Sequence, residues 1–204
     1  ASDLAYVFLG YFLGSMLFGY RITWLLKGVD IRKLAEDENP GTYNAFVFGG
    51  FWCGILTLLA DMGKGYLPVI LYRQNYSTEE LIFALVMAAP VFGHAFSIFH
   101  GRKGGKGIAV SFGSLLGLIP MWYPVLSLAV CFLFFSLVIQ ISPNFYRTVA
   151  VYIVNWLIIV FSETNLPKAV HIGVGLISLL ILLKMHMSQE EREKMTFQLL
   201  WIKR

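Results

Sequence analysis

The chain has 204 residues, of which 57% are hydrophobic and only 14% are charged. With a mean hydropathy of +0.69, it is too apolar for a soluble domain with an ordinary surface. The formal net charge of +4 is small, and a basic rim against anionic lipid headgroups accounts for it, so no nucleic-acid partner is expected. The sequence therefore predicts a single integral membrane domain that covers residues 1–204.

Seven apolar runs follow one another along the chain. They cover residues 4–26, 46–72, 81–99, 107–120, 122–141, 148–161 and 169–183. A helix needs about 20 apolar residues to cross a bilayer, and the first three runs and the fifth meet this requirement most clearly. The runs at 107–120 and 148–161 are short, which indicates helices that are tilted, partial or buried in protein. The expected fold is all-α, a polytopic membrane protein with about seven transmembrane helices.

The lysines and arginines between these runs predict the orientation. If the N-terminus lies outside, twelve of them fall on inside segments and two on outside segments. Cytoplasmic loops carry such an excess of positive charge, so we expect the N-terminus outside and the C-terminus in the cytoplasm. The twelve are Lys27, Arg32, Lys33, Arg102, Lys103, Lys106, Arg147, Lys184, Arg192, Lys194, Lys203 and Arg204, and the two are Arg73 and Lys168.

Three polar segments then share the predicted cytoplasmic side, at residues 27–45, 100–107 and 184–204. Loops on one face can build a site together, so this parity predicts a site at the cytoplasmic surface. The last segment ends in MTFQLLWIKR, a pattern suggestive of an amphipathic surface helix.

The middle segment, HGRKGGKG at residues 100–107, combines glycines with cations. Glycines let the backbone approach a ligand closely, and successive N–H groups can form an anion-binding nest. A helix that starts near Ile108 would add the positive end of its dipole, and Lys103 and Lys106 would add full charges. These features favour a phosphate or acyl phosphate ligand at the membrane surface, the alternative being a basic turn that serves only topology. A nucleotide-binding P-loop is excluded, because Lys106 is followed by glycine and no soluble strand precedes the loop.

Several polar side chains interrupt the apolar runs, among them Asp61, Lys64 and His94. Asp61 and Lys64 are three residues apart, which places them on one face of a helix. Charges at membrane depth usually face the protein interior, so the two form either a structural ion pair or part of a site. His94 is either a satisfied buried histidine or a ligand-binding one.

The glycine loop is part of a longer pattern, GH…F…F…KGGKGIA, which runs from Gly93 to Ala109. Further motifs lie elsewhere, namely LGS at 13–15, KGVDIRK at 27–33, NPG at 39–41 and ADMGKGYLP at 60–68. Together they resemble the bacterial acyl-phosphate:glycerol-3-phosphate acyltransferases over most of residues 10–190. The resemblance implies a seven-span fold in the bacterial cytoplasmic membrane, an active site on the cytoplasmic side and a role in phospholipid synthesis.

The resemblance also implies substrates and site residues. The donor would be an acyl phosphate and the acceptor a small polar molecule such as glycerol 3-phosphate, with membrane lipid around them and with no metal or cofactor. The expected substrate-binding residues are Lys103, Gly104, Gly105, Gly107, Asn39, Gly41, Asn44, His94 and Gln189. The candidate catalytic residues are His186, Lys106 and Asp37. Either His186 or the acceptor's own phosphate would take the proton of the attacking hydroxyl.

One segment departs from the family pattern. The family has GSGNxGATN followed by an arginine, whereas this chain has EDENPGTYNAFV. Glu36, Asp37 and Glu38 thus replace Gly-Ser-Gly, and Val47 replaces the arginine. At an effective dielectric constant near 20, one pair of charges 4 Å apart is worth roughly 4 kcal/mol. Several changes of this kind would weaken the binding of an anionic acceptor.

Four interpretations of this departure stay open. The enzyme could use a different acceptor, non-phosphorylated or amine-bearing. It could still use glycerol 3-phosphate, with Arg102 or Arg32 in place of the lost arginine. Asp37 could serve as a general base, or the protein could be a non-catalytic relative that binds lipid phosphates.

Overall fold

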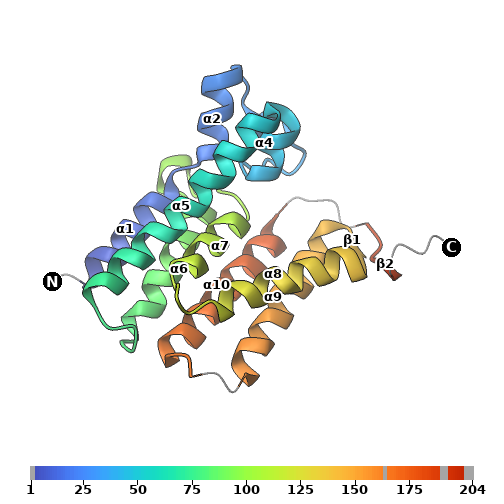
Figure 1. The fold of residues 1–204 in the computed structure, drawn as a ribbon. Coiled ribbons are helices and arrows are strands. Elements are labelled where there is room, and N and C mark those ends of the chain that lie inside the picture. Colours follow the sequence, from blue (N-terminus) through green and yellow to red (C-terminus); the bar gives the residue numbers. More distant parts are fainter. Residues whose placement is uncertain (1–2, 163–164, 189–192, 200–204) are drawn as a thin grey trace.

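The computed structural model describes residues 3–162, 165–188 and 193–199. The first half of the chain forms α1 (Asp3–Ser15), α2 (Phe18–Lys27), α3 (Ile31–Leu34), α4 (Thr42–Gly49), α5 (Phe51–Asn75), α6 (Ile82–Ala95) and a 3-10 turn η1 (Ile98–His100). The second half forms α7 (Ile108–Leu116), α8 (Tyr123–Leu133), a π-helical turn η2 (Phe134–Val138), α9 (Asn144–Phe161) and α10 (Lys168–Met187). Figure 1 shows these helices as one bundle, with α2 to α4 as a lobe at one end.

The predicted helical membrane fold is confirmed. Within the described residues, five helical segments are long and apolar enough to cross a membrane, namely Asp3–Lys27, Phe51–Asn75, Ile82–His100, Asn144–Phe161 and Lys168–Met187. A shorter apolar helix covers Tyr123–Val138, and α7 has only nine residues. The count of seven spans and the orientation therefore stay predictions.

In the described part of the segment MTFQLLWIKR, residues 196–199 differ from the suggested surface helix. Thr196–Leu199 forms strand β2, which pairs antiparallel with β1 (Ile139–Ser142), so that Ile139 lies opposite Leu199. The two sequences, TFQL and IQIS, both alternate polar and apolar residues. This period of two suits a strand and not a helix.

The apolar core extends from α5 and α6 through α7, α8 and α9 to α10. Tyr72, Phe83, Met87 and Ile177 are buried there, and the rings of Tyr72 and Phe83 stack with centroids 5.1 Å apart. On another side of α5 the short helix α7 packs so closely that a Cβ atom on Gly113 would lie 1.9 Å from the Met62 carbonyl oxygen. The run at 107–120 thus contains a partial helix that packs against protein.

The first helical segment is interrupted beside the end of α6. Met16 and Leu17 separate α1 from α2, and the Ser97 hydroxyl donates a hydrogen bond of 2.6 Å to the Ser15 carbonyl. The Tyr11 hydroxyl donates to the Phe96 carbonyl at 3.2 Å. These contacts fix the segment that follows α6, from which the glycine-rich loop leaves the bundle.

Two of the three polar segments meet at this end of the bundle. Lys106, in the glycine-rich loop, lies 3.0 Å from Asp37 in the loop before α4. The last turns of α10 also reach this end, because Ile181 lies beside Gly107 and the Lys184 ammonium lies 5.5 Å from the centroid of the Phe96 ring. The glycine-rich loop, the loop before α4 and the end of α10 therefore share one end of the bundle.

Candidate active site at the glycine-rich loop

The loop from Gly101 to Gly107 is built from tight turns. Gly101, Arg102 and Gly107 have φ angles of 58°, 64° and 85°, a region that favours glycine. The Arg102 and Lys103 amides donate to the carbonyls of Ser97 and His100. Gly107 is the residue before α7, so the loop ends at a helix N-terminus, as the sequence predicted.

Gly104 and Gly105 are required by their contact with His94. A Cβ atom on Gly104 would lie 1.8 Å from the His94 carbonyl oxygen, and one on Gly105 would lie 2.3 Å from His94 Nε2. The Gly105 amide donates to the His94 carbonyl at 3.1 Å. This amide is thus part of the loop's own structure, whereas the sequence predicted a contact between Gly105 and substrate.

The loop before α4 supplies a carboxylate to the glycine-rich loop. Asp37 Oδ2 lies 3.0 Å from Lys106 Nζ, and Asp37 Oδ1 accepts hydrogen bonds from Asn44 Nδ2 at 2.9 Å and from the Asn39 amide at 3.2 Å. Asn44 Nδ2 also donates to the Asn39 carbonyl at 2.8 Å. Asp37, Asn39, Asn44 and Lys106 therefore form one cluster, and Gly41 is the N-cap of the helix that carries Asn44.

The charge of this cluster is set by its contacts. Burial raises the pKa of Asp37, but the Lys106 ammonium and the hydrogen bonds from Asn44, Lys106 and Asn39 outweigh it and leave that pKa below its usual range. Asp37 is therefore ionised near neutral pH and neutralises Lys106. Lys103 lies 3.7 Å from Glu38, but both side chains are largely exposed, and a surface pair of this kind contributes little.

A buried charged network lies beneath the glycine loop. Lys64 Nζ lies 2.8 Å from Asp61 Oδ1, 2.8 Å from His94 Nδ1 and 2.7 Å from the Met16 carbonyl oxygen. An ammonium cannot accept a hydrogen bond, so Nδ1 of His94 must be the acceptor and the neutral ring carries its hydrogen on Nε2. Nε2 is the atom that faces Gly105. The spacing of Asp61 and Lys64 is apparent in the sequence, but no local pattern connects Lys64 to His94, thirty residues away.

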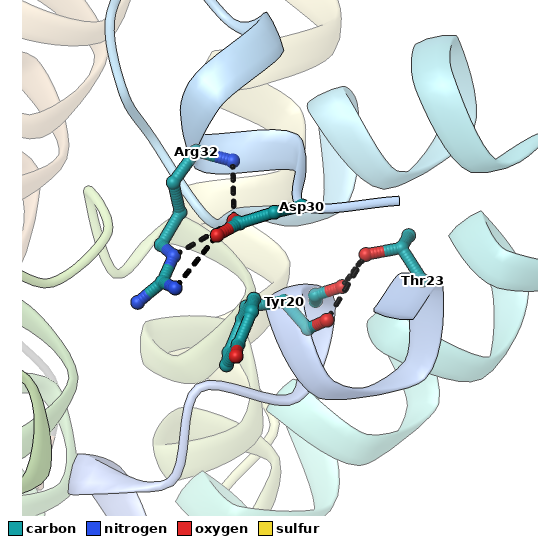
Figure 2. Close-up of polar contacts among 5 residues, drawn as sticks. Tyr20, Thr23, Asp30 and Arg32 are labelled. Atoms are coloured by element: carbon teal, nitrogen blue, oxygen red, sulfur yellow. Dashed lines mark hydrogen bonds and ion pairs between the residues drawn. The ribbon is translucent and has the colours of Figure 1, made fainter. Parts of the chain in front are cut away.

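Arg32 is already engaged elsewhere. Its guanidinium makes two contacts of 2.9 Å with the Asp30 carboxylate and lies 3.6 Å above the ring of Tyr20, as Figure 2 shows. The same carboxylate accepts a hydrogen bond from the Arg32 backbone amide, so Asp30 is the N-cap of α3. The hydrogen bond from Arg32 is the main reason that the pKa of Asp30 is lowered. Arg32 is thus a poor replacement for the missing arginine, and Val47, at that arginine's position, is 54% exposed on α4.

An apolar cavity leads toward this end of the bundle. It has a volume of about 350 Å³ and lies between α1, α6 and α10, with Phe8, Leu85 and Leu176 among its lining residues. Tyr11 and Phe92 line both this cavity and a second one that Arg102 borders. An apolar chain with an anionic head would match this sequence of surfaces, from the lipid-facing cavity to the cationic loop.

The remaining predicted residues lie in the C-terminal segment. His186 is exposed on the last turn of α10, and its role stays a prediction. Gln189 lies outside the described residues. Within the described residues, no group of three His, Cys, Asp or Glu side chains could hold a metal ion.

Comparison with known proteins places this geometry in context. A family model described as glycerol-3-phosphate acyltransferase matches residues 4–194. A relative of that name from Albidiferax ferrireducens is 39% identical over 58% of this chain and 54% of its own length. Another, from Hydrogenobaculum sp., is 32% identical over 86% of this chain and 85% of its own length. Three of the most similar curated relatives are matched over only 54%, 56% and 62% of their length.

The fold is also similar to a solved structure. The crystal structure of PlsY (YgiH), an integral membrane glycerol 3-phosphate acyltransferase in its glycerol 3-phosphate form, superposes with a TM-score of 0.79 at 26% identity. The match covers 92% of this chain and 90% of that one. The lysophosphatidic acid form of the same protein gives a TM-score of 0.77.

Proposed function

The chain belongs to the glycerol-3-phosphate acyltransferase family, and we propose that it transfers a fatty acyl group from an acyl phosphate to glycerol 3-phosphate in phospholipid synthesis. The observation that carries this proposal is the position of Lys106 at the start of α7, one residue before its N-cap. An ammonium and a helix N-terminus at one point form an anion site. The glycerol 3-phosphate and lysophosphatidic acid forms of the similar structure support the acceptor and the product.

The donor proposal rests on two neighbouring surfaces. An acyl phosphate has an anionic head and a long apolar tail. The cavity between α1, α6 and α10 is lined by apolar side chains, and the adjoining cavity is bordered by Arg102. Lys106 and Lys103 would hold the phosphate, and the apolar cavity would hold the tail.

The chemistry requires positioning more than covalent help from the protein. An acyl phosphate is an activated mixed anhydride. The acceptor hydroxyl oxygen attacks its carbonyl carbon, the bond from that carbon to the phosphate oxygen breaks, and inorganic phosphate leaves with the electron pair. The hydroxyl proton goes to His186 or to the acceptor's phosphate. Cations fixed at the donor phosphate would stabilise the leaving group, and a bound acceptor would be oriented for attack.

We propose that the site lies on the cytoplasmic side of a bacterial cytoplasmic membrane. The charge asymmetry of the loops supports this side, and the glycine-rich loop, the loop before α4 and the end of α10 share one end of the bundle.

An assay with purified protein in detergent tests the proposal. Long-chain acyl phosphate and glycerol 3-phosphate are supplied, and phosphate release and lysophosphatidic acid are both measured. Lys106→Ala should lower kcat/KM for the donor at least about 100-fold, whereas Lys168→Ala, at the start of α10 and away from the site, should not change it. Normal turnover by Lys106→Ala would refute the assignment of the site.

A second acceptor class is favoured by one specific observation. Two of the residues that could attract a second phosphate are missing or engaged, because Val47 replaces the arginine and Arg32 is paired with Asp30. A hydroxyl or amine acceptor without phosphate is the corresponding candidate. Phosphate release with glycerol or an amino alcohol, but not with glycerol 3-phosphate, would identify it. Donor binding without any phosphate release would instead identify a non-catalytic lipid-phosphate-binding protein.

A further inference from the structure

Three hydrogen-bond donors converge on the Asp37 carboxylate. They are the Lys106 ammonium at 3.0 Å, the Asn44 side-chain amide at 2.9 Å and the Asn39 backbone amide at 3.2 Å. An ammonium, a side-chain amide and a backbone amide are also the groups with which proteins bind phosphate. The carboxylate therefore occupies an arrangement of donors that suits an anionic ligand.

The Asp37 carboxylate and a phosphate cannot both contact the Lys106 ammonium closely at the same time. The side chains of Lys106 and Asp37 are only 11% and 17% exposed, so water screens their interaction incompletely. A phosphate bound at the same distance from Lys106 would lie within a few ångströms of the carboxylate and would be repelled by it. The carboxylate has to move away before the phosphate takes its place.

We propose that the Asp37 carboxylate competes with the phosphate of the substrate for the Lys106 ammonium. This competition determines which acyl phosphates bind to the site. This inference rests on the proposed function, because it places the donor phosphate at Lys106. A ligand that offers only a phosphate does not displace the carboxylate efficiently. A ligand whose apolar tail also fills the cavity between α1, α6 and α10 gains additional binding free energy and does displace it.

The same competition acts on the product. Inorganic phosphate is left at Lys106 after acyl transfer, and it has no tail to hold it. The Asp37 carboxylate stays near, because the hydrogen bond from the Asn44 side chain to the Asn39 carbonyl holds the loop that carries it. Its return to Lys106 expels the phosphate, so the wild-type protein should show weak product inhibition by phosphate.

The test replaces Asp37 and measures anion affinity directly. Asp37→Ser removes the competitor, and Asp37→Asn keeps its shape without its charge. Binding of inorganic phosphate to detergent-solubilised protein is followed by calorimetry, and phosphate is also tested as an inhibitor of donor consumption. We expect Asp37→Ser to bind phosphate at least tenfold more tightly, to be inhibited at correspondingly lower phosphate and to show a lower KM for a short-chain acyl phosphate. Asp37→Asn should change in the same direction.

A matched control removes a neighbouring charge. Glu36 is exposed and directly precedes Asp37. Glu36→Gln removes one negative charge, as the Asp37 variants do, but it leaves the hydrogen-bond donors around Asp37 in contact with the carboxylate. The affinity of Glu36→Gln for phosphate should therefore stay within twofold of wild type. Unchanged or weaker phosphate binding in both Asp37 variants would overturn the proposal. A collapse of kcat with unchanged phosphate affinity would instead make Asp37 a general base, and unfolding of both variants would make the carboxylate a structural element. If wild type releases no phosphate from acyl phosphate, the proposed function fails, but the binding measurements still decide this inference.

Discussion

Replacing Lys64 by methionine should destabilise the folded protein strongly. Lys64→Met keeps much of the side-chain volume but removes the ammonium that contacts Asp61, His94 and the Met16 carbonyl. The side chains of Asp61 and Lys64 are each only 2% exposed, so water cannot replace the lost contacts. The variant would leave a carboxylate and two neutral acceptors buried without a partner.

The magnitude follows from these three losses. Removing one member of a buried ion pair typically costs ~3–5 kcal/mol, because the other charge stays uncompensated. Replacing both members by apolar side chains of similar volume is often nearly neutral. The double variant Asp61→Leu with Lys64→Met should therefore be more stable than Lys64→Met alone, although the acceptors on His94 and Met16 still lose their donor, at about 1–3 kcal/mol each.

Unfolding of the detergent-solubilised protein measures this order of stabilities. Circular dichroism at increasing denaturant would give the midpoint for wild type, for both variants and for Lys168→Met, in which an exposed lysine is changed in the same way. We expect Lys168→Met to match wild type, Lys64→Met to have the lowest midpoint and the double variant to lie between them. A midpoint for Lys64→Met equal to that of wild type would refute the view that the buried network stabilises the fold.

Further predictions concern the loop, its acidic neighbour and the cavity. Gly105→Ala would place a methyl group against His94, so it should lower the free energy of unfolding by about 1–3 kcal/mol and abolish turnover of the acyl donor. Gly63→Ala is the control, because its methyl group would meet nothing within 4 Å, and its turnover should equal that of wild type. Equal turnover in the two variants would contradict the contact between Gly105 and His94. The pKa of Asp37 is lowered in the folded protein. The contribution of Asp37 to the free energy of unfolding should therefore be complete above its unfolded-state pKa of about 3.9, and it should be lost as the pH falls through its folded-state pKa. In Asp37→Asn, the measured free energy of unfolding should change less with pH over this range. Leu176→Trp should fill the apolar cavity and shift donor preference toward shorter acyl chains, and an unchanged chain-length profile in a steady-state assay would argue against this location for the tail.

Sequence reasoning succeeded where a local pattern carries the information. The apolar runs gave the helical membrane fold, and the parity of the polar segments brought Lys106 and Asp37 to one end of the bundle. The motif also singled out Gly104 and Gly105, for which the sequence predicted a contact with substrate. In the structure, side chains at these positions are excluded by the contact of the loop with His94. These features depend on residue type and order alone, which a single sequence contains.

Contacts between distant segments were not predictable in this way. The link from Lys64 to Met16 depends on a break in the first helical segment. Gly14 and Gly19 flank this break, but they do not place it at Met16 and Leu17. Asp30 and Arg32 are two residues apart, so the sequence can indicate their ion pair. The position of Arg32 above the Tyr20 ring depends on the tertiary fold. Tertiary contact decides such cases, and local propensity does not.

The apolar cavity between α1, α6 and α10 has a practical consequence for kinetics. Phe8, Leu85 and Leu179 line it and are also among the exposed apolar side chains, so its opening faces the hydrocarbon phase. A donor that enters there arrives by lateral diffusion within the lipid or micelle. Its effective concentration is then a mole fraction in that phase, and a rate measured at fixed bulk concentration should fall when detergent is added, by dilution of the donor over a larger surface.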